Sequence, residues 1–247
     1  MTKGELGGRQ VEGRRAVREL LTAGRRRVRH VVLATITDAR PLEELAALAD
    51  ASGATVEWIP PEELASRART EAPQGVLAEA EPLVPDDLDE LLDDPSAFLV
   101  ALDGVTDPQN LGAVLRSAEA AGATGAIVPR RRSAPITPAA VKAAAGAVEH
   151  LRIAVVSGIP SALERARRSH VWTVGLDGRG PVDLFDLTLA DQPLVLVLGA
   201  EGGGLGRLAR DRCDVVARIP MLGRTTSLNV SAAAAVACFE IARRRVA

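Results

Sequence analysis

Aromatic side chains are scarce in this chain of 247 residues: they make up 2% of it, with no tyrosine, two tryptophans and three phenylalanines. Proteins that hold single-stranded nucleic acid on an RRM or OB-fold surface stack several bases on exposed aromatic rings. The composition therefore argues against a base-stacking platform of this kind.

Cysteine and histidine are also rare. Cys213 and Cys238 allow one disulfide at most, and we expect two buried thiols in a reducing cytoplasm. His30, His150 and His170 show no metal-ligand spacing among themselves or with the cysteines. The sequence therefore predicts a protein without a metal site.

Long apolar runs are absent as well. No uninterrupted run approaches the roughly 20 residues needed to cross a bilayer. The first ten residues are polar and rich in glycine, unlike a secretory signal. Hydrophobic residues make up 47% of the chain and charged residues 25%, which is typical of a globular protein. We expect a cytoplasmic protein that does not enter the membrane.

Lysine is nearly missing, because 28 of the 30 basic residues are arginines. This bias reflects either a high-GC coding sequence or the match between a guanidinium and a phosphate group. The net charge of −2 argues against a strongly cationic nucleic-acid binder. However, the first 32 residues carry nine Lys and Arg against three Glu, which is either a solvated face or a surface that follows phosphates.

Composition divides the chain into three parts. Residues 1–80 alternate helix and strand patterns, which predicts a small sheet with helices packed on it. Residues 81–95 carry seven Asp and Glu, three prolines and no basic residue, which indicates an acidic linker. Residues 96–247 contain short strands rich in Val, Leu and Ile, typical of a parallel sheet buried under helices. We therefore expect a two-domain α/β protein.

The first of three chemically informative stretches begins where a strand ends. Asp107 is a candidate N-cap of a helix whose first turn contains Asn110. Arg116 would point about 150° away from the apolar stripe of this helix. It shares that face with small residues such as Gly112 and Ala120, so we expect Arg116 to lie in a crevice. The alternative is a capped surface helix with a solvated arginine.

The second stretch is a buried strand, 194–199, followed by a glycine-rich turn that contains Glu201. Ligands of α/β proteins bind at the carboxyl ends of the strands, and glycines permit close backbone approach. The alternative is a tight turn without a ligand. Residues 204–209 also fit the pattern G-x-G-x-x-A of dinucleotide-binding enzymes, which leaves an oxidoreductase as a weaker alternative.

The third stretch runs from a strand that ends at Pro220, through a polar loop, into an alanine-rich helix. Either Ser227 or Asn229 caps this helix, whose N-terminal amides are suited to an anion. Capping explains one of these two side chains but not both, so we expect the other to serve a ligand.

The three stretches together resemble the motifs of the SpoU (TrmH-like) branch of the SPOUT RNA methyltransferases, in the same order and spacing. The resemblance covers nearly the whole chain, and 1–80 resembles the L30e-like RNA substrate-binding domain of that family through Gln74, Gly75 and Val76. Family members that act on a guanosine of 23S rRNA are the most similar, although they usually have His where this chain has Pro73. The matching strings are 107–116, 198–204, 219–223 and 227–231.

The resemblance implies a deep trefoil knot in the C-terminal α/β domain, 96–247, which is an exception to the rule that chains are not knotted. It implies S-adenosylmethionine as the cofactor, contacted largely through backbone at Gly199, Ile219 and Leu228. It also implies a homodimer whose active site is completed at or near the subunit interface.

The implied activity is methyl transfer to a ribose 2′-hydroxyl of RNA, most similar to that of the enzymes acting on a guanosine of 23S rRNA. The resemblance assigns the catalytic role to Asn110, Arg116, Glu201, Ser227 and Asn229. A guanidinium is effectively always positively charged in proteins, so we expect Arg116 to grip a phosphate and stabilise negative charge rather than to act as a base.

Two alternatives are open at this point. Relatives also methylate tRNA or another nucleotide of rRNA. A non-catalytic RNA-binding or ribosome-assembly factor would retain the first domain and its basic residues, but it would not need all five candidate catalytic side chains.

Overall fold

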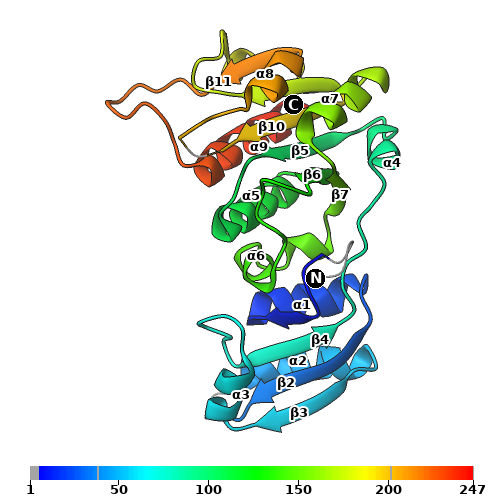
Figure 1. The fold of residues 1–247 in the computed structure, drawn as a ribbon. Coiled ribbons are helices and arrows are strands. Elements are labelled where there is room, and N and C mark those ends of the chain that lie inside the picture. The colour runs from blue at the N-terminus through cyan, green and yellow to red at the C-terminus, as the bar shows by residue number, and fades with distance from the viewer. Residues whose placement is uncertain (1–5, 38, 201, 247) are drawn as a thin grey trace. The chain divides into compact units, whose positions relative to one another are not determined.

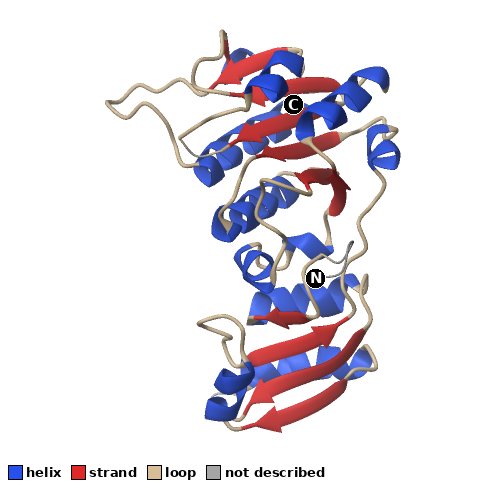
Figure 2. Cartoon of the chain, viewed as in Figure 1, coloured by secondary structure: helices blue, strands red, loops and turns tan. Residues whose placement is uncertain are grey.

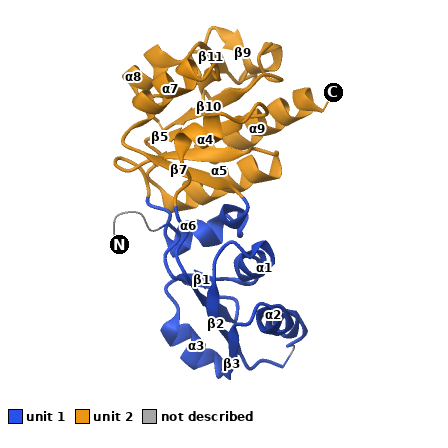
Figure 3. Ribbon diagram, turned by 90° about the vertical axis from the view of Figure 1, so that its right-hand side faces the viewer, with its two compact units in different colours: residues 1–84, 135–150 blue, residues 85–134, 151–247 orange. Residues whose placement is uncertain are grey.

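Two β-sheets organise the part of the chain that the computed structural model describes, residues 6–37, 39–200 and 202–246. Each sheet belongs to one of two compact units (Figure 3). Unit 1 comprises Met1–Val84 and Pro135–His150, and unit 2 comprises Pro85–Ala134 and Leu151–Ala247.

Unit 1 contains a small mixed sheet in the strand order β1-β4-β2-β3, where β2 and β3 are parallel and the other pairs antiparallel (Figure 1). The strands are β1 (Gln10–Glu12), β2 (Val28–Ala34), β3 (Thr55–Ile59) and β4 (Val76–Ala80). The helices are α1 (Arg14–Ala23), α2 (Arg40–Ala51), α3 (Pro61–Arg67), α6 (Pro138–Ala143) and the 3-10 turn η1 (Ala147–Glu149). The predicted alternation of strands and helices is confirmed.

Unit 2 is built on a parallel sheet in the order β7-β6-β5-β10-β8-β11-β9 (Figure 2). Its strands are β5 (Phe98–Asp103), β6 (Gly125–Pro129), β7 (Arg152–Val156), β8 (Trp172–Leu176), β9 (Val182–Asp183), β10 (Leu194–Gly199) and β11 (Val215–Arg218). Its helices are α4 (Leu88–Leu92), α5 (Pro108–Ala120), α7 (Ile159–Arg168), the 3-10 turn η2 (Leu184–Asp186), α8 (Arg207–Arg212) and α9 (Val230–Arg245). The expected parallel sheet is confirmed.

The central strands of unit 2 are buried on both faces. Side chains alternate along a strand, so Leu99 and Val195 join a core with α4, α7 and α8. Phe98 and Leu196 point to the opposite face and are fully buried there. Helices α5 and α9 pack against each other and against β6 and β10. This arrangement explains why these strands have continuous apolar runs rather than an alternating pattern.

The acidic stretch 81–95 does not form a separate linker, because most of it belongs to unit 2. Leu88, Leu91 and Leu92 of α4 are buried in the unit 2 core. Arginines of β7 and α7 form ion pairs with its acidic side chains: Arg152 with Asp86 and Glu90, and Arg165 with Asp87 and Asp89. The acidity therefore balances arginines of the same unit.

The second difference from the expected boundaries is residues 135–150, which belong to unit 1 although they were assigned to the second domain, 96–247. A buried ion pair holds them: Arg26 Nη1 lies 2.9 Å from Glu149 Oε1, and the two side chains are 1% and 0% exposed. Arg26 also donates to the carbonyl oxygens of Gly8 and Glu81. One member of the basic run is thus a core residue of unit 1.

Candidate active site

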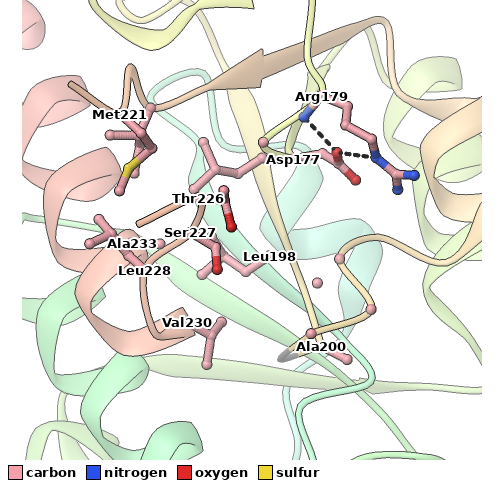
Figure 4. Close-up of a pocket in the computed structure, with 17 residues that line it drawn as sticks. Asp177, Arg179, Leu198, Ala200, Met221, Thr226, Ser227, Leu228, Val230 and Ala233 are labelled. Atoms are coloured by element: carbon pink, nitrogen blue, oxygen red, sulfur yellow. Dashed lines mark hydrogen bonds and ion pairs between the residues drawn. The ribbon is translucent and has the colours of Figure 1, made fainter. Parts of the chain in front are cut away.

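A cavity of about 600 Å³ opens at the carboxyl ends of β8, β10 and β11 (Figure 4). Sites for small ligands and cofactors typically occupy about 300–1,000 Å³. The lining residues are Leu176, Asp177, Gly178, Arg179, Leu198, Gly199, Ala200, Gly202, Gly203, Gly204, Ile219, Met221, Thr226, Ser227, Leu228, Val230 and Ala233. Two of the three informative stretches, the second and the third, therefore meet around one space.

The glycine-rich turn forms one wall of this cavity. Ala200 and Gly204 exchange two backbone hydrogen bonds of 3.0 Å, which close the turn. A Cβ at Gly199 would lie 2.2 Å from the carbonyl carbon of Gly204, so only glycine fits at the end of β10. Gly204 has a φ of 65°, in the left-handed region that favours glycine. Glu201, the predicted catalytic carboxylate of this turn, lies outside the described residues.

The loop between β11 and α9 forms the opposite wall. Ile219, Ser227 and Leu228 of this loop line the cavity. The three predicted cofactor residues, Gly199, Ile219 and Leu228, therefore all line the same cavity. Asn229 is the cap of α9: its Oδ1 accepts from the backbone N–H of Ser231 at 2.8 Å. The structure therefore decides between the two possible caps and leaves Ser227 facing the cavity.

A pair of amides joins the first and third stretches. Asn229 Nδ2 donates to Asn110 Oδ1 at 3.2 Å, and Asn110 Nδ2 donates to Asp107 Oδ2 at 3.1 Å. Asp107 also accepts from the backbone N–H of Gln109 at 3.0 Å, which confirms it as the N-cap of α5. The starts of α5 and α9 are thus linked next to Val230, which lines the cavity.

Arg116 lies elsewhere in the single chain. Its side chain on α5 is exposed, and it does not line the cavity. No hydrogen bond or ion pair joins it to any residue in the described part of the chain. The prediction that Arg116 lies in a crevice is therefore wrong for the single chain, because the small residues on its face leave its side chain open to solvent.

Asp177 is a lining residue that the sequence motifs did not identify. It directly follows β8, and its side chain is 4% exposed. Burial alone would raise the pKa of this carboxyl, but hydrogen bonds from Arg179 and the charge of Arg210 outweigh burial and hold the pKa below its ordinary value. The rule that ligands bind at the carboxyl ends of parallel strands would have pointed to this position.

Both cysteines are free thiols with raised pKa values. Burial raises the pKa of Cys213 and of Cys238 to about 12, so both stay protonated, and neither forms a disulfide. Within the described ranges there is no group of three or more His, Cys, Asp or Glu that could hold a metal. No described helix has the length and apolar character that a membrane span requires.

Comparison with known proteins gives a consistent result over both units. Residues 97–239 match the model of the SpoU rRNA methylase family. Residues 10–85 match the model described as RNA 2′-O ribose methyltransferase substrate binding. The first match alone covers more than half of the chain.

Individual relatives extend over almost the full length. The 23S rRNA (guanosine-2′-O-)-methyltransferase RlmB of Pseudomonas syringae is 40% identical over 243 residues, which is 96% of each chain. The crystal structure of the SpoU methyltransferase AviRb from Streptomyces viridochromogenes with AdoMet is 29% identical, has a TM-score of 0.79, and covers 96% of this chain and 90% of that one. An AdoMet-bound rRNA methyltransferase from Sinorhizobium meliloti has the same identity and TM-score, with coverages of 96% and 87%. The chain therefore belongs to the SpoU rRNA methylase family and is an RNA 2′-O-methyltransferase.

Proposed function

We propose that this enzyme transfers a methyl group from S-adenosylmethionine to the ribose 2′-hydroxyl of a guanosine in 23S rRNA. The observation that carries the proposal is the convergence of the glycine-rich turn and the β11–α9 loop on one cavity, next to the Asn110–Asn229 pair. The choice of nucleotide rests on the RlmB relatives, which are 39–40% identical over 96% of this chain.

The residues around the cavity suit S-adenosylmethionine. Leu176, Leu198 and Ile219 offer an apolar surface for a nucleoside, and the glycine-rich turn brings backbone groups close to the cavity. Asp177 supplies a buried negative charge for a cationic ligand. When bound, S-adenosylmethionine supplies a methyl group on a positively charged sulfur, which is open to attack by an oxygen nucleophile.

We assign the cofactor contacts to Gly199, Ile219 and Leu228. Gly199 packs so closely on Gly204 that a side chain would change the path of the turn. Ile219 and Leu228 lie on the other wall and come from the start and end of the same loop. A ligand held between these walls is fixed largely by backbone, which favours a single orientation.

The catalytic roles fall to Asn110, Arg116, Glu201, Ser227 and Asn229. The amides of Asn110 and Asn229 form a hydrogen bond with each other, and Ser227 faces the cavity three residues before α9 begins. In this proposal they orient the target ribose, and Glu201 orients the glycine-rich turn. Arg116 carries a positive charge, grips the target phosphate and stabilises the charge that develops on the attacking oxygen.

A second subunit completes the site in this proposal. Arg116 is exposed and is not among the residues that line the cavity of one chain. An RNA bound across a homodimer gives Arg116 a contact that a single chain does not. The proposed fold of 96–247 includes a trefoil knot formed by the two loops that line the cavity.

The N-terminal domain, 1–80 as expected from the sequence, is proposed to bind the rRNA. The family model of RNA substrate binding covers 10–85. Arg15 and Arg27 are exposed there and suited to phosphate contacts, whereas Arg26 is buried. With few aromatic residues, the domain holds RNA by arginine–phosphate contacts and shape.

The proposal is tested by methylation of transcribed 23S rRNA and total tRNA with radiolabelled S-adenosylmethionine, followed by mapping of 2′-O-methyl sites. We expect one guanosine of 23S rRNA to be modified by the native enzyme, and no site to be modified by an Asn110→Ala variant. Modification of tRNA alone would overturn the choice of substrate. Absence of cofactor binding and of methylation on either RNA would favour a non-catalytic RNA-binding protein.

A further inference from the structure

Asp177 is the one carboxylate among the described residues that line the cavity. It follows β8 directly, and Figure 4 shows its side chain beside Arg179 at the edge of the cavity. The other described polar side chains of the lining are Arg179, Thr226 and Ser227. A negative charge at this place therefore needs its own explanation.

The two oxygens of Asp177 have unequal surroundings. Oδ1 accepts hydrogen bonds from the backbone N–H and Nε of Arg179, at 2.9 and 3.3 Å, and lies 3.1 Å from Arg210 Nη1. Oδ2 is buried and has no hydrogen-bond partner among the described residues. A buried carboxylate oxygen without a partner is unfavourable, and such groups are few in native proteins.

The glycine-rich turn leaves room for this oxygen. A Cβ at Gly204 would lie 2.9 Å from Asp177 Oδ2, so a side chain there would collide with the carboxylate. Gly204 itself lines the cavity. The absence of a side chain at 204 thus keeps the charge of Asp177 next to the space where the ligand is proposed to bind.

The charge of Asp177 is less exposed to solvent than the charges of its two arginine partners. The Arg179 side chain is 76% exposed and the Arg210 side chain 30% exposed, whereas that of Asp177 is 4% exposed. Water and salt screen exposed charges and screen buried ones much less. A positive charge inside the cavity is therefore stabilised by Asp177.

The two forms of the proposed cofactor differ by one positive charge. S-adenosylmethionine carries a sulfonium, and the product S-adenosylhomocysteine carries a neutral thioether at the same atom. The inference rests on the proposed function: we propose that Asp177 is a binding residue whose buried charge makes the cavity prefer the methyl donor over the spent product. The preference helps the product to leave after each transfer.

Calorimetry on the full chain tests this with three probes: S-adenosylmethionine, S-adenosylhomocysteine and sinefungin, which has a protonated amine where the donor has its sulfonium methyl. We expect Asp177→Asn to weaken the binding of the two cationic probes about tenfold, because the attraction between the carboxylate and the positive charge of the probe is lost. We expect the binding of S-adenosylhomocysteine to weaken less than about threefold, because it has no positive charge at this atom. Equal weakening for all three probes, or no weakening, would overturn the inference.

Arg210→Gln is the matched variant, because it removes the positive charge that lies 3.1 Å from Asp177 Oδ1. If the charge of Asp177 is the cause, Arg210→Gln has the opposite effect to Asp177→Asn and raises the preference for the cationic probes over S-adenosylhomocysteine. A merely structural role predicts that both variants lose all three probes alike. The Arg210 variant also keeps the test decisive if Asp177→Asn fails to fold.

Binding to the native chain distinguishes a failure of the proposed function from a failure of the inference about Asp177. If it binds none of the three probes, the proposed function fails and the inference with it. If it binds S-adenosylmethionine but Asp177→Asn leaves the preference for cations unchanged, only the inference fails.

Discussion

Asn229 Nδ2 donates a hydrogen bond to Asn110 Oδ1 at 3.2 Å, and this contact ties the N-terminus of α9 to the N-terminus of α5. Asn229 also caps α9 through its Oδ1. One side chain thus serves both the stability of a helix and the geometry of the proposed catalytic site, and the two roles can be separated by substitution.

Replacing Asn229 with Ser keeps a good N-cap and removes the amide that reaches Asn110. We expect Asn229→Ser to leave the free energy of unfolding within about 0.5 kcal/mol of the native value, while Asn229→Ala loses about 1 kcal/mol. Both variants lose methyl transfer at least about tenfold because the orientation of Asn110 is lost. Urea unfolding and single-turnover methylation measure the two effects. Full activity of Asn229→Ser would show that the amide pair is dispensable.

Two glycines of the same turn give a matched pair for cofactor binding. A Cβ at Gly199 would lie 2.2 Å from Gly204, whereas a Cβ at Gly203 meets nothing within 4 Å. We expect Gly199→Ala to weaken S-adenosylmethionine binding at least about tenfold, because the wall of the cavity must move, and Gly203→Ala to change it less than about twofold. Calorimetry measures both affinities. If Gly199→Ala binds S-adenosylmethionine as tightly as the native chain, this wall of the cavity does not contact the ligand.

The end of α9 makes a prediction about pH. The hydrogen bond from Arg243 is the main cause that lowers the pKa of Glu240 from 4.5 to about 2, with Arg244 adding to it. A carboxyl with a lowered pKa in the folded state stabilises the protein above pH 4.5, and this contribution is lost as the pH falls from 4.5 toward 2. We expect Glu240→Gln to be less stable than the native chain at pH 6, with the difference shrinking at pH 3.

Urea unfolding of both proteins at several pH values measures this difference. Arg243→Gln is the companion variant, because it removes the hydrogen bond that contributes most to the lowered pKa of Glu240. We expect it to reduce the same pH dependence. A constant difference between Glu240→Gln and the native chain from pH 6 to pH 3 would contradict the lowered pKa.

Most of the fold of this chain could be predicted from sequence patterns that act locally. The apolar stripe of α1, with Val17 and Leu20, and the continuous apolar run of β10 predict from the local sequence alone that these residues are buried. The same holds for Asp107, whose place before a proline marks the start of α5. Short-range rules suffice wherever a residue and its partners lie within one element.

The features that escaped prediction depend on partners far apart in sequence. Arg26 and Glu149 form a buried pair across 123 residues, and this pair assigns 135–150 to unit 1. Arg245, the last residue of α9, donates to the carbonyl oxygens of Ser96, Ala97, Ala190 and Gln192. Nothing in the local sequence distinguishes these arginines from exposed ones.

The same distinction leads to the last prediction, which concerns RNA affinity. Arg15 and Arg27 are exposed, whereas Arg18 forms an ion pair with Glu44. We expect the double variant Arg15→Gln/Arg27→Gln to lower the slope of log affinity against log salt for an rRNA fragment by about one to two, since each lost phosphate contact contributes about 0.7–0.9. Arg18→Gln, the control, changes the slope by less than half as much, because its charge is already neutralised by Glu44. Filter binding between 50 and 200 mM salt measures the slopes. An unchanged slope in the double variant would place the RNA on another face of the domain.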